Sequence, residues 1–131
     1  MKLNIEIIKE LYADFAIGNG AGIEAIFEKD IEWIQMKGFP GGGHFFGFNE
    51  IAENVFKGFG KNWTNWKAIT DEFVDAGDSV FVIGRYLGTY NTTQKSMEAE
   101  FVHRYTLKDG KVIRFNQYTD TKLVADAIEG E

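Results

Sequence analysis

An Asp-Gly pair near the C-terminal end of the chain constrains its fold more than any other feature. Residues 97–120 contain two runs rich in β-branched and aromatic residues, which Asp109 and Gly110 separate. A type I′ turn needs positive φ at both of its central positions, and Asp-Gly is a favoured pair there. We therefore predict a β-hairpin in which Lys108 faces Lys111 and the remaining pairs follow by counting outward.

Counting outward from this turn places an unusual mixture of side chains on one face of the hairpin. Directly opposed residues share a face. The expected pairs are Tyr105 with Arg114, His103 with Asn116, Phe101 with Tyr118, and Ala99 with Asp120. Because aromatic walls combined with His, Asn and Asp are rare on a plain core face, we interpret this face as the wall of a ligand pocket.

The composition limits the classes of function. The 131 residues are 44% hydrophobic and 15% aromatic, which fits one packed domain over residues 1–131. A net charge of −6 argues against a nucleic-acid partner, and the absence of cysteine removes disulfides and thiol nucleophiles. With two histidines and no cysteine, a metal site would need carboxylates that we cannot align, so we expect none. We find no signal peptide and no apolar run long enough to span a membrane, so we expect a cytoplasmic protein that does not bind membranes.

Apolar periodicity predicts the element order α-α-β-α-β-β-β-β-α, an α+β fold with helices segregated from a curved, mostly antiparallel sheet. Asn4 and Asn49 are expected to cap the first and third helices, and Asp120 or Thr121 the short last one. Strands are expected over residues 31–36, 63–75 and 79–90 and in both hairpin arms. Residues 38–47 are glycine-rich and aromatic, and we interpret them as a loop that forms a flap over the cavity.

The strand over residues 79–90 supports a cavity on one face and a partner on the other. If Tyr86 pairs with Phe101, then Gly84 faces His103 and Gly88 faces Ala99, so two glycines flank Tyr86. Glycine inside a strand often marks a bend or a close approach. The opposite face of the sheet is more apolar than a surface that meets water should be. Its expected apolar members are Phe81, Ile83, Leu87, Val102, Ile113 and Phe115. We therefore predict a homodimer through this outer sheet face.

Several segments in a fixed order resemble the ketosteroid-isomerase and SnoaL-like polyketide cyclase branch of the nuclear-transport-factor-two-like superfamily. They are residues 22–27 (GIEAIF), 31–33 (IEW), 39–42 (FPGG), 109–111 (DGK) and 118–121 (YTDT). The resemblance covers almost the whole chain. It implies a single cystatin-like cone, in which a curved sheet wraps around about three helices and encloses an apolar cavity. Members of the superfamily include isomerases, cyclases, dehydratases, epoxide hydrolases and proteins without catalytic activity, so the fold does not fix the function.

Carrying over the residues of ketosteroid isomerase argues against that reaction. The resemblance places the catalytic base of the first strand at Gln35, whose amide has no useful basicity. It places the tyrosine of the first helix at Leu11, next to Tyr12, and the aspartic acid of the oxyanion hole at His103. His103 therefore keeps a group that can exchange a proton at one of these positions, whereas Gln35 cannot replace the catalytic base.

The SnoaL-like polyketide cyclases resemble the chain more closely. The resemblance places their histidine on the penultimate strand at His103 and their acid/base aspartate at Asp120, which would protonate or deprotonate the ligand. In the expected register these two residues are roughly 13 Å apart, so a ligand or water molecules would have to lie between them. The Asp–Arg–Asp set of the epoxide hydrolases would use Arg114 and Asp120 but lacks a second inward aspartate.

Two classes of function stay open after this comparison. The first is a cofactor-free isomerase, cyclase or hydratase that acts on a hydrophobic carbonyl compound, with His103 and Asp120 as catalytic groups. The second is a non-catalytic protein of the same fold that binds an apolar ligand or acts as a dimeric interaction module. In both, the expected ligand-binding residues are Tyr12, Phe15, Trp33, Gln35, Tyr86, Phe101, Tyr105, Asn116 and Tyr118.

Overall fold

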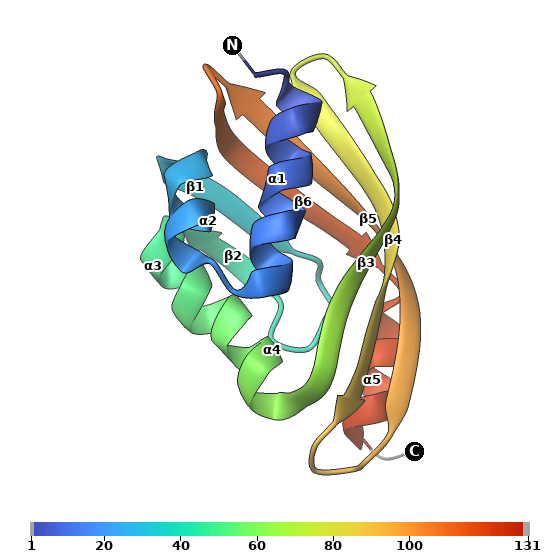
Figure 1. The fold of residues 1–131 in the computed structure, drawn as a ribbon. Helices are drawn as coiled ribbons and strands as arrows, with labels where there is room; N and C mark the ends of the chain where they lie inside the picture. The colour runs from blue at the N-terminus through green and yellow to red at the C-terminus, as the bar shows by residue number, and fades with distance from the viewer. Residues whose placement is uncertain (1, 130–131) are drawn as a thin grey trace.

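A curved, unclosed sheet of six strands wraps around the helices of the N-terminal half in the computed structural model, which describes residues 2–129 (Figure 1). The elements in chain order are α1 (Asn4–Ile17), α2 (Gly20–Ile26), β1 (Phe27–Gln35), β2 (Gly43–Phe46), α3 (Phe48–Ile51), the π-helix η1 (Ala52–Phe56), α4 (Lys57–Asn62), β3 (Trp63–Ala76), β4 (Ser79–Tyr90), β5 (Ser96–Lys108), β6 (Lys111–Thr119) and α5 (Thr121–Glu129). The strand order is β2-β1-β6-β5-β4-β3, and only the β1–β6 pair is parallel. The predicted α+β fold is confirmed.

Helix α1 lies across the concave face of the sheet and carries part of the core (Figure 1). Its apolar positions recur at helical spacing, and Ile8, Leu11 and Tyr12 are buried. Gly18 ends the helix in the left-handed conformation with φ of 69°, which glycine adopts at little cost. Within residues 2–129, no helix combines the length and the apolar character that crossing a bilayer requires.

Both predicted asparagine caps are wrong. Leu3 holds the N-cap position of α1, and the side chain of Asn4 instead donates to the carbonyl of Gly77 at 3.1 Å. Gly47 holds the N-cap position of α3, where Asn49 is already helical. In both places contacts with distant parts of the chain, or the backbone conformation of glycine, outweigh the local capping preference of asparagine.

The first strand and the glycine-rich loop also differ from expectation. Strand β1 begins at Phe27, four residues earlier than predicted, where it pairs with Val112 of β6. The predicted loop contains the edge strand β2, in which Phe45 lies opposite Trp33. Tertiary pairing thus overrides the low strand propensity of the glycines.

The predicted turn is confirmed, but the hairpin register is wrong beyond it. Asp109 and Gly110 have φ of 52° and 78°, and Lys108 faces Lys111. A β-bulge then leaves Ile113 without a partner, since Val112 pairs with Leu107 and Arg114 with Thr106.

A slip of one residue moves every later side chain of β6 to the opposite face. Phe115 and Gln117, opposite Tyr105 and His103, therefore face the concave side and are buried. The placement of Asn116 and Tyr118 on this face is wrong: they lie on the outer face, and Tyr118 is 47% exposed.

The β4–β5 pairing keeps the predicted faces although its register is shifted by two residues. Tyr86 lies opposite Ala99, and Gly84 opposite Phe101. An even shift preserves which side chains point inward. A Cβ atom on Gly84 would lie 2.0 Å from the carbonyl oxygen of Ile69, so the close approach expected at this glycine is present.

Candidate functional site

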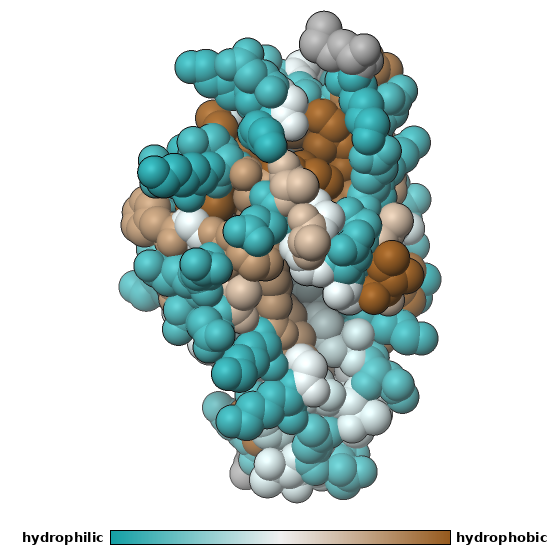
Figure 2. Space-filling model, turned by 60° about the vertical axis from the view of Figure 1, so that its left-hand side comes forward, coloured by the Kyte–Doolittle hydropathy of each residue, from teal (hydrophilic) through white to brown (hydrophobic). Residues whose placement is uncertain are grey.

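A cavity of about 890 Å³ lies between the concave face of the sheet and the helices. Most of its wall is aromatic or aliphatic, with Phe15, Phe56 and Trp66 among the lining residues. Its exposed lining residues include Gly18 and Lys67, which place its mouth between the end of α1 and the start of β3. Figure 2 shows a hollow on one side of the molecule, with pale and brown atoms inside and hydrophilic residues on much of its rim.

A chain of hydrogen bonds among five buried residues, the polar network, forms the inner end of this cavity. The hydroxyl of Tyr12 contacts Nδ1 of His103 and lies 2.9 Å from the hydroxyl of Tyr105. On the other side of the imidazole, Nε2 of His103 lies 2.5 Å from the hydroxyl of Tyr86. Gln117 donates from Nε2 to the same Tyr86 oxygen at 2.8 Å.

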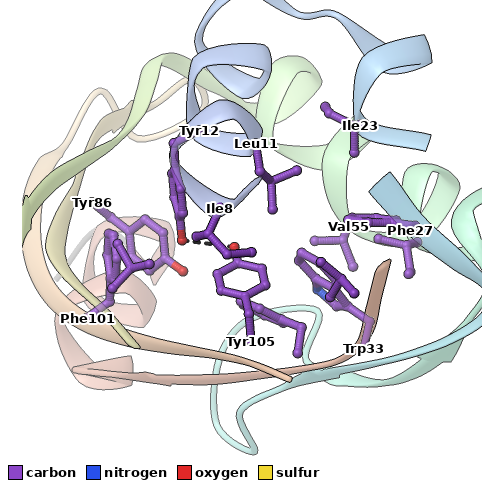
Figure 3. Close-up of a cluster of buried hydrophobic side chains, with 14 of the residues drawn as sticks. Ile8, Leu11, Tyr12, Ile23, Phe27, Trp33, Val55, Tyr86, Phe101 and Tyr105 are labelled. Carbon is purple, nitrogen blue, oxygen red and sulfur yellow. Dashed lines mark hydrogen bonds between the residues drawn. The ribbon is translucent and has the colours of Figure 1, made fainter. Parts of the chain in front are cut away.

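Four elements bring these side chains together. Tyr12 points from α1 toward the sheet, where its hydroxyl meets that of Tyr105 on β5, and Tyr86 on β4 points toward the same region (Figure 3). The ring of Phe101 stacks on His103 with the centroids 3.8 Å apart. The carbonyl of Gln117 accepts from the backbone N–H of Met36 at 3.0 Å, which directs its amide nitrogen at Tyr86.

Burial keeps the polar network uncharged near neutral pH. It lowers the pKa of His103 to about 3, because an imidazolium would lose its hydration inside the protein. It also raises the pKa of the phenols of Tyr12, Tyr86 and Tyr105, for which the phenolate would be the desolvated ion. At pH 7 His103 is therefore a neutral imidazole with one N–H donor and one acceptor nitrogen.

A count of protons shows that one hydroxyl of the polar network always lacks an acceptor within it. Four hydrogen bonds join the five residues, and Gln117 donates one of them. The other three bonds need three protons, whereas three phenols and one imidazole N–H supply four. The phenols and His103 all line the cavity, so the remaining proton is available to a ligand there.

Gln35 offers the cavity a second donor. Its Oε1 accepts from the indole N–H of Trp33 at 2.9 Å, so the orientation of the amide follows from the one hydrogen that indole can give. Its Nε2 has no hydrogen-bond partner among residues 2–129, although only 4% of the residue is exposed. Gln35 lines both this cavity and a neighbouring one of about 330 Å³ beneath α5.

The structure brings together most, but not all, of the residues singled out from the sequence. His103 lines the cavity, together with Tyr12, Phe15, Trp33, Gln35, Tyr86 and Tyr105. Phe101 is buried behind His103. Asp120 lies outside the cavity: it is exposed, and its carboxylate accepts from the backbone N–H of Leu123 at 3.3 Å, as a cap of α5.

Sequence reasoning missed Gln117 and Phe115, which occupy the places expected for Asn116 and Arg114. One signal could have found them. The regular register put the charged Arg114 inside beside Tyr105, whereas a bulge near the turn replaces it with Phe115. In the structure Arg114 instead forms an ion pair with Glu32 at 3.2 Å.

The cavity wall contains very little charge. Among the described residues that line it, Lys67 at the mouth carries the one charged side chain, and none is a carboxylate. Residues 2–129 also contain no group of three or more His, Cys, Asp or Glu side chains that could hold a metal ion. The polar groups present at the inner end are phenols and a neutral imidazole, which donate and accept hydrogen bonds.

Comparisons with known proteins agree with this architecture. The sequence pattern of the SnoaL-like domain matches residues 8–115. An NTF2-like protein of Burkholderia thailandensis is 38% identical, with a TM-score of 0.94 and 98% of each chain covered. TerC, co-crystallised with polyporic acid, is 29% identical, with a TM-score of 0.85 and 96% of this chain and 98% of that chain covered.

A more distant structure shares the fold alone. A protein of Shewanella denitrificans described as a SnoaL-like polyketide cyclase is 8% identical, with a TM-score of 0.81 over the full length of both chains. The search of curated proteins found no match.

Proposed function

The chain belongs to the SnoaL-like family of NTF2-like proteins, and from this premise we propose that its cavity binds a small, mainly aromatic carbonyl compound. The unpaired hydroxyl proton of the polar network carries this proposal. A carbonyl oxygen accepts this proton and adds no donor of its own. A ligand hydroxyl would also accept it, but would bring a further proton that needs an acceptor. A volume of about 890 Å³ is in the range of small-molecule sites.

Two further observations support a ligand of this class. The amide nitrogen of Gln35 gives a second donor, which favours a ligand with two oxygen acceptors. The aromatic wall contributes apolar area and ring stacking, as with the indole of Trp66, which itself stacks on Phe59 at 4.2 Å. TerC was co-crystallised with polyporic acid, so a related chain has been studied with a small organic molecule.

In this proposal His103 and the tyrosines polarise or exchange protons with the carbonyl compound. Because burial lowers the pKa of His103 to about 3, it acts as a neutral donor and acceptor and not as an imidazolium acid. Asp120 has no part in this chemistry, since it is exposed and caps α5. The reaction class that fits is an isomerase or cyclase type without a cofactor; the alternative is binding alone.

We expect 2-acetylnaphthalene to bind about tenfold more tightly than 2-ethylnaphthalene, which has a similar shape but no carbonyl oxygen. Quenching of tryptophan fluorescence measures both, because Trp33, Trp63 and Trp66 line the cavity. Ala16→Trp narrows the mouth from an exposed position and should abolish binding. Ala13→Trp is the matched control, since Ala13 is exposed on the same helix and does not line the cavity. Equal affinity for the two compounds, or an unchanged affinity in Ala16→Trp, would exclude this site.

We also propose that the outer sheet face pairs with a second copy of the chain. Val74 and Ile83 are each 37% exposed there, and the exposed Tyr118 lies on the same face, across β5 from Ile83. Arg104 and Glu100 alternate on the same face, so a two-fold contact can place unlike charges opposite one another. Ile83→Glu should convert a dimer into a monomer in sedimentation equilibrium, whereas Leu3→Glu, exposed at the start of α1, should not. A monomeric wild type at high concentration would rule out this contact.

A further inference from the structure

We propose that the polar network is a proton relay, in which a change of the His103 tautomer moves one proton between Tyr86 and Tyr105. The substrate class would be an enolisable aromatic carbonyl compound, and the reaction its keto–enol tautomerisation. This inference rests on the proposed function, since the substrate has to bind against the network. It adds to that function a specific reaction and the atoms that perform it.

Two of the complete arrangements that the hydrogen bonds allow have every donor between Tyr86 and Tyr105 pointing the same way, and they run in opposite directions. In the first, Tyr86 donates to Nε2 of His103, Nδ1–H donates to Tyr12, and Tyr12 donates to Tyr105, whose own hydroxyl proton is free. In the second, Tyr105 donates to Tyr12, Tyr12 to Nδ1, and Nε2–H to Tyr86, whose proton is then free. Gln117 donates to Tyr86 in both, so it does not oppose the exchange.

A bound enol converts one arrangement into the other. The enol O–H gives its proton to the oxygen of Tyr86, whose own proton passes to Nε2 of His103. The proton on Nδ1 passes to Tyr12, that of Tyr12 to Tyr105, and that of Tyr105 to the α-carbon of the enol. One O–H bond of the substrate breaks and one C–H bond forms, the C=C electron pair supplies the new bond, and the carbonyl is regenerated. No oxidant, reductant or other reactant is consumed.

The network then has to return to its first arrangement. A water molecule that enters through the mouth can accept from Tyr86 and donate to Tyr105, which runs the same shift backward. Binding of the next substrate in the opposite orientation has the same effect. The relay is therefore reversible and serves enolisation as well as ketonisation.

The surroundings favour a shift of several protons together over separate ionic steps. The groups that face His103 are the phenols of Tyr12, Tyr86 and Tyr105, and the charged Lys67 lies at the exposed mouth. Burial lowers the pKa of the imidazole and raises that of each phenol, so an intermediate with a charge on any of them is unfavourable. Moving all the protons in one direction leaves every group neutral.

The test uses benzoylacetone, whose enol absorbs in the near ultraviolet where its ketone does not. The enol is diluted from an apolar solvent into buffer, and the loss of absorbance is followed with and without protein. We expect wild-type protein to accelerate ketonisation by about 100-fold over buffer. His103→Gln keeps a neutral group that donates and accepts but cannot exchange tautomers, so it should lose the acceleration while affinity changes by no more than about threefold.

Two further measurements separate the relay from a purely structural role of His103. The protein-catalysed rate should not vary between about pH 5 and pH 8, because no group of the network titrates there. Tyr12→Phe interrupts the chain between His103 and Tyr105 and should also abolish the acceleration. A rate that follows an ionisation near pH 6.5, or full activity in either variant, would overturn the relay. Binding of benzoylacetone without acceleration would overturn the relay and leave the proposed binding function intact, and absence of binding would overturn both for this class of compound.

Discussion

As the pH falls from 6.5 to about 3, protonation of His103 in the unfolded chain is expected to lower the free energy of unfolding by about 1.4 kcal/mol per pH unit. In the unfolded chain the imidazole titrates at its ordinary pKa of 6.5, whereas burial lowers the pKa in the folded protein to about 3. Above pH 6.5 both states hold a neutral His103, so its contribution to stability is fully present. Below that value the unfolded state binds the extra proton, and stability is lost until the folded state is protonated as well.

Urea denaturation of the wild type and His103→Gln across this pH range measures the effect. Carboxylates titrate in the same range, but their contribution cancels in the difference between the two proteins. That difference should become less favourable to the wild type by about 2.5 kcal/mol between pH 6 and pH 4, since the unfolded imidazole is already partly protonated at pH 6. A difference that stays constant with pH would mean that His103 is hydrated, or that a counter-ion accompanies it.

Gly84→Ala is expected to destabilise the protein by about 3 kcal/mol, through overpacking against backbone. A Cβ atom at this position would lie 2.0 Å from the carbonyl oxygen of Ile69 and 2.7 Å from the ring of Phe101. The first neighbour is backbone on β3, so β3 and β4 would have to separate. The second neighbour stacks on His103, so the strain would also reach the polar network. Thermal or urea unfolding measures the loss.

Gly60→Ala is the matched control for this substitution. Gly60 lies inside α4, its φ is not positive, and apart from its chain neighbours and the backbone of its own helix nothing lies within 4 Å of a Cβ built there. Alanine favours a helix over glycine by about 1 kcal/mol, so this variant should be as stable as the wild type or more stable. If Gly84→Ala were equally harmless, the close contact between β3 and β4 would not exist in solution.

Much of the fold could be predicted because local signals and tertiary structure agree. The Asp109-Gly110 turn has one preferred geometry, and strand alternation puts Ile31, Trp33 and Gln35 on one shared face, which is buried in the structure. The four strands after the helices have clear boundaries, because turn residues interrupt long runs of strand-forming side chains. The order of the elements then left few topologies, and the family resemblance selected one of them.

The remaining differences come from features that local sequence encodes weakly. The β-bulge at Ile113 has no recognisable sequence signature. It nevertheless moves Phe115 and Gln117 into the core and turns Asn116 outward. Strand β2 forms because β1 offers an open edge, in spite of a glycine-rich sequence.

The candidate site was predicted better in its aromatic wall than in its chemistry. Aromatic residues on the concave face follow from alternation, which a two-residue register shift preserves. Hydrogen-bond partners depend on exact register, so Gln117 was missed and Asp120 was expected inside. The contact between Tyr12 and His103 joins residues 91 positions apart, and only the packing of α1 on the sheet determines it.

The central claim is that His103 is a neutral imidazole inside an uncharged network with one proton to share. Long-range proton–nitrogen NMR of protein labelled with ¹⁵N-histidine tests it directly, because the two ring nitrogens report separately whether each carries a proton. From neutral pH down to about pH 5, the account predicts one protonated and one unprotonated nitrogen on His103. His44, exposed on β2, gives a second histidine signal in the same spectrum, and His103→Gln assigns the two. Two protonated nitrogens on His103 at pH 6 would contradict the account.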